Sequence, residues 1–239
     1  MLTATAMALV VATTMLAGTT TASVATERAS ARPAVGECRV LKVDDLADGS
    51  NNTPTVQCSA AHTARTFAVV TVGRKISTLS KKEIRKVGEA QCTPKFFHVM
   101  GESWRDRIKS AYFFVFYTPT TKQVKDGQNW LRCDLVLAKG RGLANLPNNN
   151  TPVIGSKGVN ANAKACVSKQ YKLTVCAEGH KWNPAGAFAI KRENKPSAWQ
   201  VSQLAEDHCK NIAGTARFTY VNWLSEWNSG NKMVMCFKR

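Results

Sequence analysis

The chain has 239 residues and a formal net charge of +17, from 33 Lys and Arg residues against 16 Asp and Glu residues. The length suits one large domain or two small ones. The charge favours an anionic partner such as phospholipid, wall polymer or nucleic acid, although it also fits a soluble protein with a weakly adhesive surface.

The first 25 residues have the pattern of a secretory signal peptide. An apolar run from Met7 to Leu16 is followed by small residues and by Ser23-Val24-Ala25, which fits a cleavage site. The run is short for a membrane span, and no Lys or Arg precedes it. We expect a signal peptide over 1–25, a disordered segment over 26–34 and export, with a retained N-terminal membrane anchor as the alternative.

Eight cysteines form two sets of four with similar spacing. The sets are Cys38, Cys58, Cys92 and Cys133, followed by Cys166, Cys176, Cys209 and Cys236. Each second cysteine opens a Cys-x-x-x-His pattern that ends at His62 or His180. An even cysteine count in an exported chain indicates disulfides. We expect the first cysteine of each set to pair with the second, and the third with the fourth, although four cysteines allow three pairings.

The first set of cysteines is accompanied by strand and helix patterns. Strands are predicted at residues 38–41, 56–58, 67–72, 111–117 and 129–137, and a helix is predicted from residue 81 to Cys92. Ser80 and Glu83 fit a capping box at the start of this helix. Cys92 falls on the same helical face as Ile84 and Gly88, and Pro94 should end the helix or begin a new turn soon after Cys92.

The same elements recur around the second set. Strands are predicted at 166–167, 173–176, 187–190, 217–221 and 232–237, with a helix between a Ser197 cap and Cys209. Residues 141–163, rich in Asn, Pro and Gly, are predicted to be a linker. The expected fold is α+β: two tandem modules over 35–140 and 164–239, each a mainly antiparallel sheet with one packed helix and two disulfides.

These residues resemble the septum-formation domain of exported and envelope proteins in high-GC Gram-positive bacteria. The resemblance rests on Val35-Gly36-Glu37-Cys38, Val56 to His62, the helix ending at Cys92, the aromatic strand 112–117, Thr118-Pro119-Thr120, and Trp227-Asn228-Ser229-Gly230. Val124 stands where the first set would carry the tryptophan of that last motif. The resemblance implies a role in division or envelope biology, and it brings no agreed chemistry and no catalytic residues.

His62 and His180 are the leading candidates for a ligand contact, because both cysteine sets carry one. Cysteine and histidine at short spacing can bind zinc, but Cys58 and Cys176 offer no thiolate when they are oxidised. We therefore prefer a structural interpretation, in which each histidine bonds a backbone carbonyl or an acid at a strand end. No metal and no cofactor are expected.

Trp223 and Trp227 are the other candidate contacts, and packing beside the last disulfide is an equally good interpretation of them. The sequence contains no Gly-x-Ser-x-Gly, no His-Glu-x-x-His and no phosphate-binding glycine loop. The two cysteine sets share no carboxylate pair at matching positions, which counts against a glycosidase.

Together these patterns predict an exported, non-enzymatic binding protein of the cell envelope, associated with septum formation. Its expected partner is an anionic envelope polymer, a lipid surface or an acidic protein; nucleic acid is not an expected partner, and the sequence does not indicate an oligomeric state. The alternatives are a secreted hydrolase or metal-binding enzyme that uses His62 and His180, and a purely structural spacer.

Overall fold

The computed structural model describes residues 32–101, 103–147, 159 and 162–239. The predicted signal peptide lies outside these residues, as does most of the segment predicted to be disordered. The described residues fall within one compact unit of the chain. None of their helices combines the length and the apolar character that a membrane span requires.

The first half of the described chain is an antiparallel sheet built around one central strand. Its strands are β1 (Cys38–Arg39), β2 (Thr55–Val56), β3 (Ala64–Thr71), β4 (Tyr112–Tyr117), β5 (Trp130–Lys139) and β6 (Gly142–Ala144). Central β5 pairs with β3, with β4 and, near its end, with β6. Residues 130–137 of β5 are all buried, so both faces of this strand are covered by other parts of the protein.

The second half contributes a hairpin and a second sheet. Its strands are β7 (Ala165–Val167), β8 (Leu173–Val175), β9 (Asn183–Ala189), β10 (Phe218–Asn222) and β11 (Met233–Lys238). Strand β11 lies between β9 and β10 in a three-stranded antiparallel sheet. The β7–β8 hairpin joins the first sheet instead, because Thr174 of β8 pairs with Lys139 of β5.

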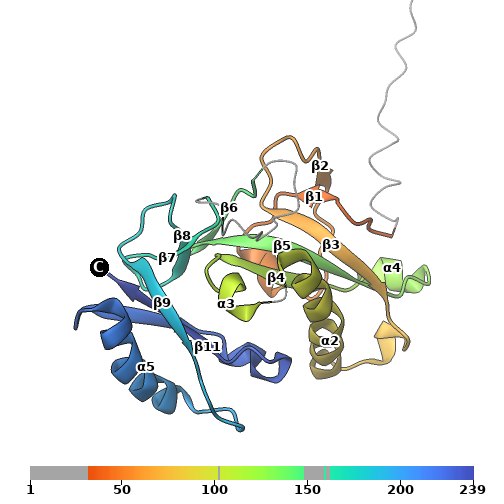
Figure 1. The fold of residues 1–239 in the computed structure, drawn as a ribbon. Helices are drawn as coiled ribbons and strands as arrows, with labels where there is room; N and C mark the ends of the chain where they lie inside the picture. The colour runs from red at the N-terminus through yellow and green to blue at the C-terminus, as the bar shows by residue number, and fades with distance from the viewer. Residues whose placement is uncertain (1–31, 102, 148–158, 160–161) are drawn as a thin grey trace, which may run out of the picture. The chain divides into compact units, whose positions relative to one another are not determined.

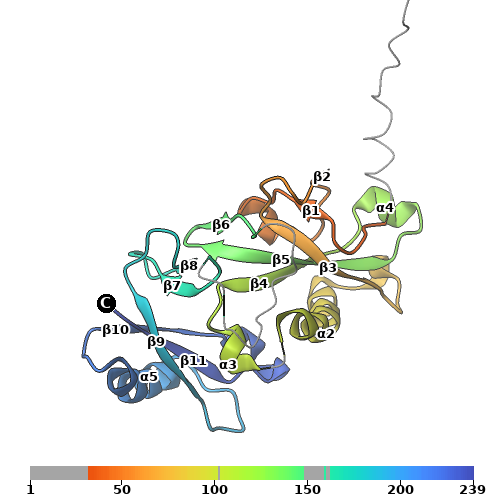
Figure 2. The ribbon, with the colours of Figure 1, turned by 45° about the horizontal axis from the view of Figure 1, so that its top comes forward.

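Two long helices lie against these sheets. The helices are α2 (Lys81–Met100), α3 (Trp104–Arg107), α4 (Thr121–Lys125) and α5 (Ala198–Ala213), with 3-10 turns η1 (Asp44–Ala47), η2 (Ile76–Thr78) and η3 (Leu224–Ser229). The capping boxes predicted at Ser80 and Ser197 are confirmed as the starts of α2 and α5. In both ribbon views α2 lies against the sheet of β3, β4 and β5, and α5 lies against the sheet of β9 to β11 (Figure 1 and Figure 2).

The expected disulfide pairing is confirmed. The bonds join Cys38 to Cys58, Cys92 to Cys133, Cys166 to Cys176 and Cys209 to Cys236. In each half one disulfide ties the long helix to the central strand, from α2 to β5 and from α5 to β11. Opposite each of these cysteines the neighbouring strand carries one extra residue, at position 67 of β3 opposite Cys133 and at position 185 of β9 opposite Cys236, which is the signature of a β-bulge.

The predicted end of the first long helix is wrong. Helix α2 continues through Pro94 to Met100, although proline removes one helical hydrogen bond. Beyond Pro94, Phe96 and Met100 are buried in the core, and the Phe96 ring lies 5.2 Å from that of Phe114 in β4. Burial of these apolar side chains offsets the missing hydrogen bond.

The predicted linker is also wrong at its start. Residues 142–144 form β6, and Ala144 and Leu146 are buried in the core. The Leu146 N–H donates to the His62 carbonyl at 2.8 Å, which ties this stretch to the first half. Composition pointed to a loop here, but pairing with β5 is a long-range contact that local composition does not report. The later part of the predicted linker, apart from residues 159, 162 and 163, lies outside the described residues.

Gly88 allows α2 to approach β4 closely. A Cβ atom added at this position would overlap the ring of Phe116. We expect Gly88→Ala to lower the free energy of unfolding by about 1–3 kcal/mol through overpacking, although alanine is the better helix former by about 1 kcal/mol. Gly73→Ala is the matched control, because a Cβ there meets no atom within 4 Å. Urea unfolding measures both, and a Gly88→Ala protein more stable than the wild type would contradict the prediction.

Candidate functional site

The two predicted histidines lie in equivalent turns. The Nδ1 atom of His62 lies 2.8 Å from the carbonyl oxygen of Ala60, and the Nδ1 atom of His180 lies 3.1 Å from that of Glu178. In both cases the carbonyl belongs to the residue two positions earlier. The geometry therefore matches the structural interpretation, in which the ring closes a tight corner after the second cysteine.

The surroundings of the two rings differ. His62 is 1% exposed, whereas His180 is partly exposed and its Nε2 atom also contacts the Asn183 side-chain oxygen at 3.1 Å. The neighbouring Cys58 and Cys176 are held in disulfides. Across the described ranges, no group of three or more His, Cys, Asp or Glu residues is arranged to hold a metal ion.

The two candidate tryptophans pack in different places. Trp227 is 6% exposed, belongs to the cluster around Cys209 and Cys236, and has the Lys232 ammonium 5.0 Å from its ring centre. Trp223 packs instead against the cluster that contains Phe237. The structure therefore places Trp227 beside the last disulfide and does not bring the two rings together as one binding platform.

The aromatic side chains that do face solvent are others. Among the described residues Trp199 is 70% exposed and Tyr171 is 60% exposed. Neither residue is among the candidates that the sequence predicted. A sequence signal for Tyr171 did exist, because it lies with Lys169 and Lys172 in the short stretch between Cys166 and Cys176.

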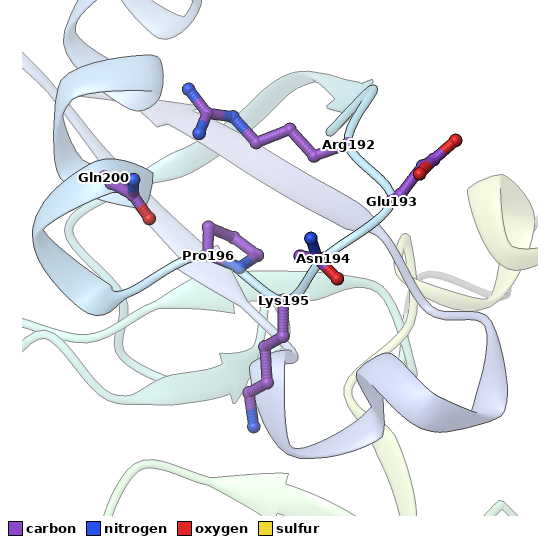
Figure 3. Close-up of a pocket in the computed structure, with 6 residues that line it drawn as sticks. All are labelled: Arg192, Glu193, Asn194, Lys195, Pro196 and Gln200. Atoms are coloured by element: carbon purple, nitrogen blue, oxygen red, sulfur yellow. The ribbon is translucent and has the colours of Figure 1, made fainter.

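A shallow hollow lies where the loop after β9 enters α5. It is lined by Arg192, Glu193, Asn194, Lys195, Pro196 and Gln200 (Figure 3). The side chains of Arg192 and Lys195 extend in different directions in this view, so they do not converge on one point. The Gln200 N–H at the start of α5 donates to the Ser197 hydroxyl. Because the two cations point apart and the Ser197 hydroxyl already accepts a bond from the start of α5, this hollow is not a built anion-binding pocket.

A buried ion pair lies on the face of β5 opposite Cys133. The Arg132 Nε donates to Asp134 at 2.8 Å, and neither side chain is more than 2% exposed. The Thr66 hydroxyl also donates to Asp134, at 2.8 Å. The Arg132 Nη atoms donate to the backbone and side-chain oxygens of Asn51 at 3.2 and 3.0 Å. These bonds attach the loop between β1 and β2 to the sheet.

Arg39 extends this network to β1. Its Nη1 donates to the Thr66 hydroxyl at 2.9 Å, its Nε donates to the Thr53 carbonyl at 3.2 Å, and its Nη2 pairs with Glu37. Burial raises the pKa of Asp134, and the Arg132 guanidinium and the Thr66 hydroxyl oppose that rise. Because Arg132 and Asp134 are closed to solvent, they position the loop and do not contact a ligand.

Comparison with known proteins assigns the family. A family model described as septum formation matches residues 71–236 in a single copy. The match covers more than half of the chain and spans both halves of the structure, so the chain belongs to the septum formation family. No curated protein and no solved structure matches it. Family membership and the four disulfides together suggest a division-related protein outside the cytoplasm.

The contrast in exposure between the histidines yields a paired prediction. We expect His62→Ala to lower the free energy of unfolding by about 2–4 kcal/mol, because it removes a buried, hydrogen-bonded ring. His180→Ala should cost less than about 1 kcal/mol, since that ring is partly solvated. Urea unfolding of the oxidised proteins measures both, and equal losses would contradict the structural role assigned to His62.

The buried ion pair yields a second prediction. Asp134→Leu leaves the Arg132 guanidinium buried without its carboxylate and should cost about 3–5 kcal/mol. Adding Arg132→Met removes that unpaired charge, so the double variant should be more stable than Asp134→Leu alone by at least about 1 kcal/mol. Denaturant unfolding of the two single variants and the double variant measures the coupling. Additive losses would show that the pair does not act as a unit.

Proposed function

We propose that this protein is an exported, non-enzymatic binding protein of the cell envelope that acts in septum formation. The family match supports the link to division, and the four disulfides support an oxidising compartment. In this proposal the protein contacts an anionic wall polymer or lipid surface; an acidic protein is the remaining candidate partner.

One observation carries the binding proposal: both halves have an excess of positive charge. Residues 36–139 hold 17 Lys and Arg against 10 Asp and Glu, and residues 164–239 hold 12 against 5, so each half has a net charge of +7. Six of these cations, Arg39, Arg74, Lys109, Lys122, Arg132 and Lys139, pair with acids of the described residues, and the cations of each half outnumber its acids. A surface of this kind attracts polyanions.

The positive charge includes an exposed run at the start of α2. Lys81, Lys82, Arg85 and Lys86 are all exposed, and the single acid among them, Glu83, is engaged by Ser80 and Arg74. The bond from the Ser80 N–H is the main cause that lowers the pKa of Glu83. The four cations therefore face solvent on the first two turns of α2.

The enzyme alternative has less support. A hydrolase or metal-dependent enzyme that used both histidines would need each ring to reach a substrate, and His62 is 1% exposed. A catalytic pair is also expected to converge on one cavity, whereas each of these rings closes its own turn.

We also infer that the two halves are copies of one module, over 35–140 and 164–239. The shared order of three strands (β3–β5–β4 and β9–β11–β10), the shared helix-to-strand disulfide and the bulge opposite the fourth cysteine support this inference. The copies would not be independent bodies, because β8 pairs with β5.

Retention on isolated cell envelopes tests the binding proposal. The oxidised protein should sediment with envelopes at about 0.1 M salt and be released as the salt approaches about 1 M. Release is expected because the Debye length falls from about 10 Å to about 3 Å over this range. A variant carrying Lys82→Glu and Lys86→Glu should be released at lower salt than the wild type. A matched variant carrying Glu206→Gln and Asp207→Asn should be retained at least as well as the wild type. Retention that does not change with salt would contradict the proposal.

A further inference from the structure

The tip of the β7–β8 hairpin is cross-linked by a disulfide and by hydrogen bonds within its loop. Its loop runs from Ser168 to Lys172 and is closed by the disulfide between Cys166 and Cys176, whose Cα atoms are 4.9 Å apart. The Ser168 N–H donates to the Lys172 carbonyl at 2.9 Å, and the Ser168 hydroxyl accepts the N–H groups of Gln170 and Lys172, each at 3.3 Å. These bonds hold the tip in one conformation.

Tyr171 lies at this tip in a conformation that tyrosine rarely adopts. Its φ is 57°, and within the described part of the chain no other residue except glycine has a positive φ. Such a conformation costs about 1–3 kcal/mol for a residue with a side chain, whereas Asn or Gly would fit the turn more easily. Tyr171 is also 60% exposed. The turn alone does not explain a tyrosine at this position, so we look for a role of its exposed ring.

The ring of Tyr171 rests on a fixed aromatic base. Its centre lies 5.8 Å from that of Trp182, with 38° between the ring planes. Trp182 is 6% exposed, and its backbone exchanges two hydrogen bonds of 3.0 Å with Val167 in β7. The indole N–H of Trp182 is buried and donates to no acceptor among the described residues.

Positive charge surrounds the tip. Lys169 and Lys172 are exposed on either side of Tyr171, and the Lys181 ammonium lies 5.5 Å from the ring centre of Trp182. The single acid between residues 164 and 182 is Glu178, which pairs with Lys139 at 2.8 Å. The cations beside the ring are therefore available to an external anion.

We propose that this hairpin tip binds a sugar chain that carries acidic groups. The C–H face of a sugar ring stacks on the electron-rich face of Tyr171, and Lys169, Lys172 and Lys181 meet the carboxylate or phosphate groups of the chain. The proposal rests on the proposed function and names the ligand class and the residues that recognise it.

The structure favours a sugar chain over a membrane surface. Attachment to a lipid surface scales with the apolar area that enters it. In the described part of this hairpin Tyr171 is the one large apolar side chain with high exposure; the others that are exposed lie elsewhere, at Val35, Val40, Val43 and Trp199. One ring suits stacking on a sugar better than it suits insertion into a bilayer.

Four probes separate the contributions of charge and ring. We expect the oxidised full-length protein to bind polygalacturonate, an acidic sugar chain, at least about tenfold more tightly than poly-glutamate of equal charge. Dextran, a neutral sugar chain, and vesicles of equal parts phosphatidylglycerol and phosphatidylcholine should bind more weakly than polygalacturonate. Titration calorimetry and vesicle sedimentation measure these affinities.

Substitutions at the tip test the residues. Tyr171→Asn keeps the left-handed turn and removes the ring, so it should lower the affinity for polygalacturonate about tenfold and leave poly-glutamate binding unchanged. Tyr171→Phe should keep the affinity. Trp199→Ala, which removes the other exposed aromatic ring, is the control and should also keep it. Unfolding midpoints of the variants confirm that the hairpin is intact.

The outcomes distinguish this inference from the function on which it rests. If Tyr171→Asn binds polygalacturonate as tightly as the wild type, or if Trp199→Ala loses as much affinity, the sugar site is wrong. Tyr171-dependent binding to vesicles without binding to polygalacturonate would also overturn it and would assign the tip to lipid. If the sugar site is wrong but the wild-type protein is still retained on envelopes in a salt-dependent way, the proposed function is unaffected. If the wild-type protein is not retained on envelopes at any salt concentration, the proposed function is wrong.

Discussion

The disulfide between the long helix and the central strand is the constraint on which the rest of the structure depends. Because Cys133 must face α2, the alternation of a strand sends Arg132 and Asp134 to the opposite face. In the second half the disulfide between Cys209 in α5 and Cys236 in β11 likewise sends Met235 and Phe237 to the face of β11 that points away from α5. The helix side is therefore similar in both halves, and the opposite side is where the halves differ.

The two halves cover that opposite side by different means. In the first half the loop between β1 and β2 is attached to the sheet by hydrogen bonds that Arg132 donates to Asn51. In the second half Met235 and Phe237 pack in an apolar cluster with Ile108 and Trp104, which come from the first half. A polar face can be closed by a hydrogen-bonded loop, whereas an apolar face requires apolar neighbours. This explains why the second half is packed against the first within one compact unit.

Cysteine spacing and helix caps were enough to predict most of the elements, because both signals are local. The expected disulfide pairing is the one that the structure shows, although the sequence left three pairings open for each set. The end of α2 was missed since the burial of Phe96 and Met100 outweighs Pro94. Strand β6 was missed since its pairing partner is β5 and its composition is that of a loop. The buried pair of Arg132 and Asp134 and the exposed Tyr171 were not anticipated, because burial and backbone conformation depend on contacts that a single sequence does not display.

The pairing of Lys139 with Thr174 has a mechanical consequence. A ligand that pulls on the β7–β8 hairpin transmits tension through the sheet into β5, and from β5 through the covalent bond at Cys133 into α2. The hairpin is also braced at its own base by the bond between Cys166 and Cys176. If the tip holds an envelope polymer, as proposed, force on that polymer would reach the sheet of the first half through this pairing and would not act on the hairpin alone.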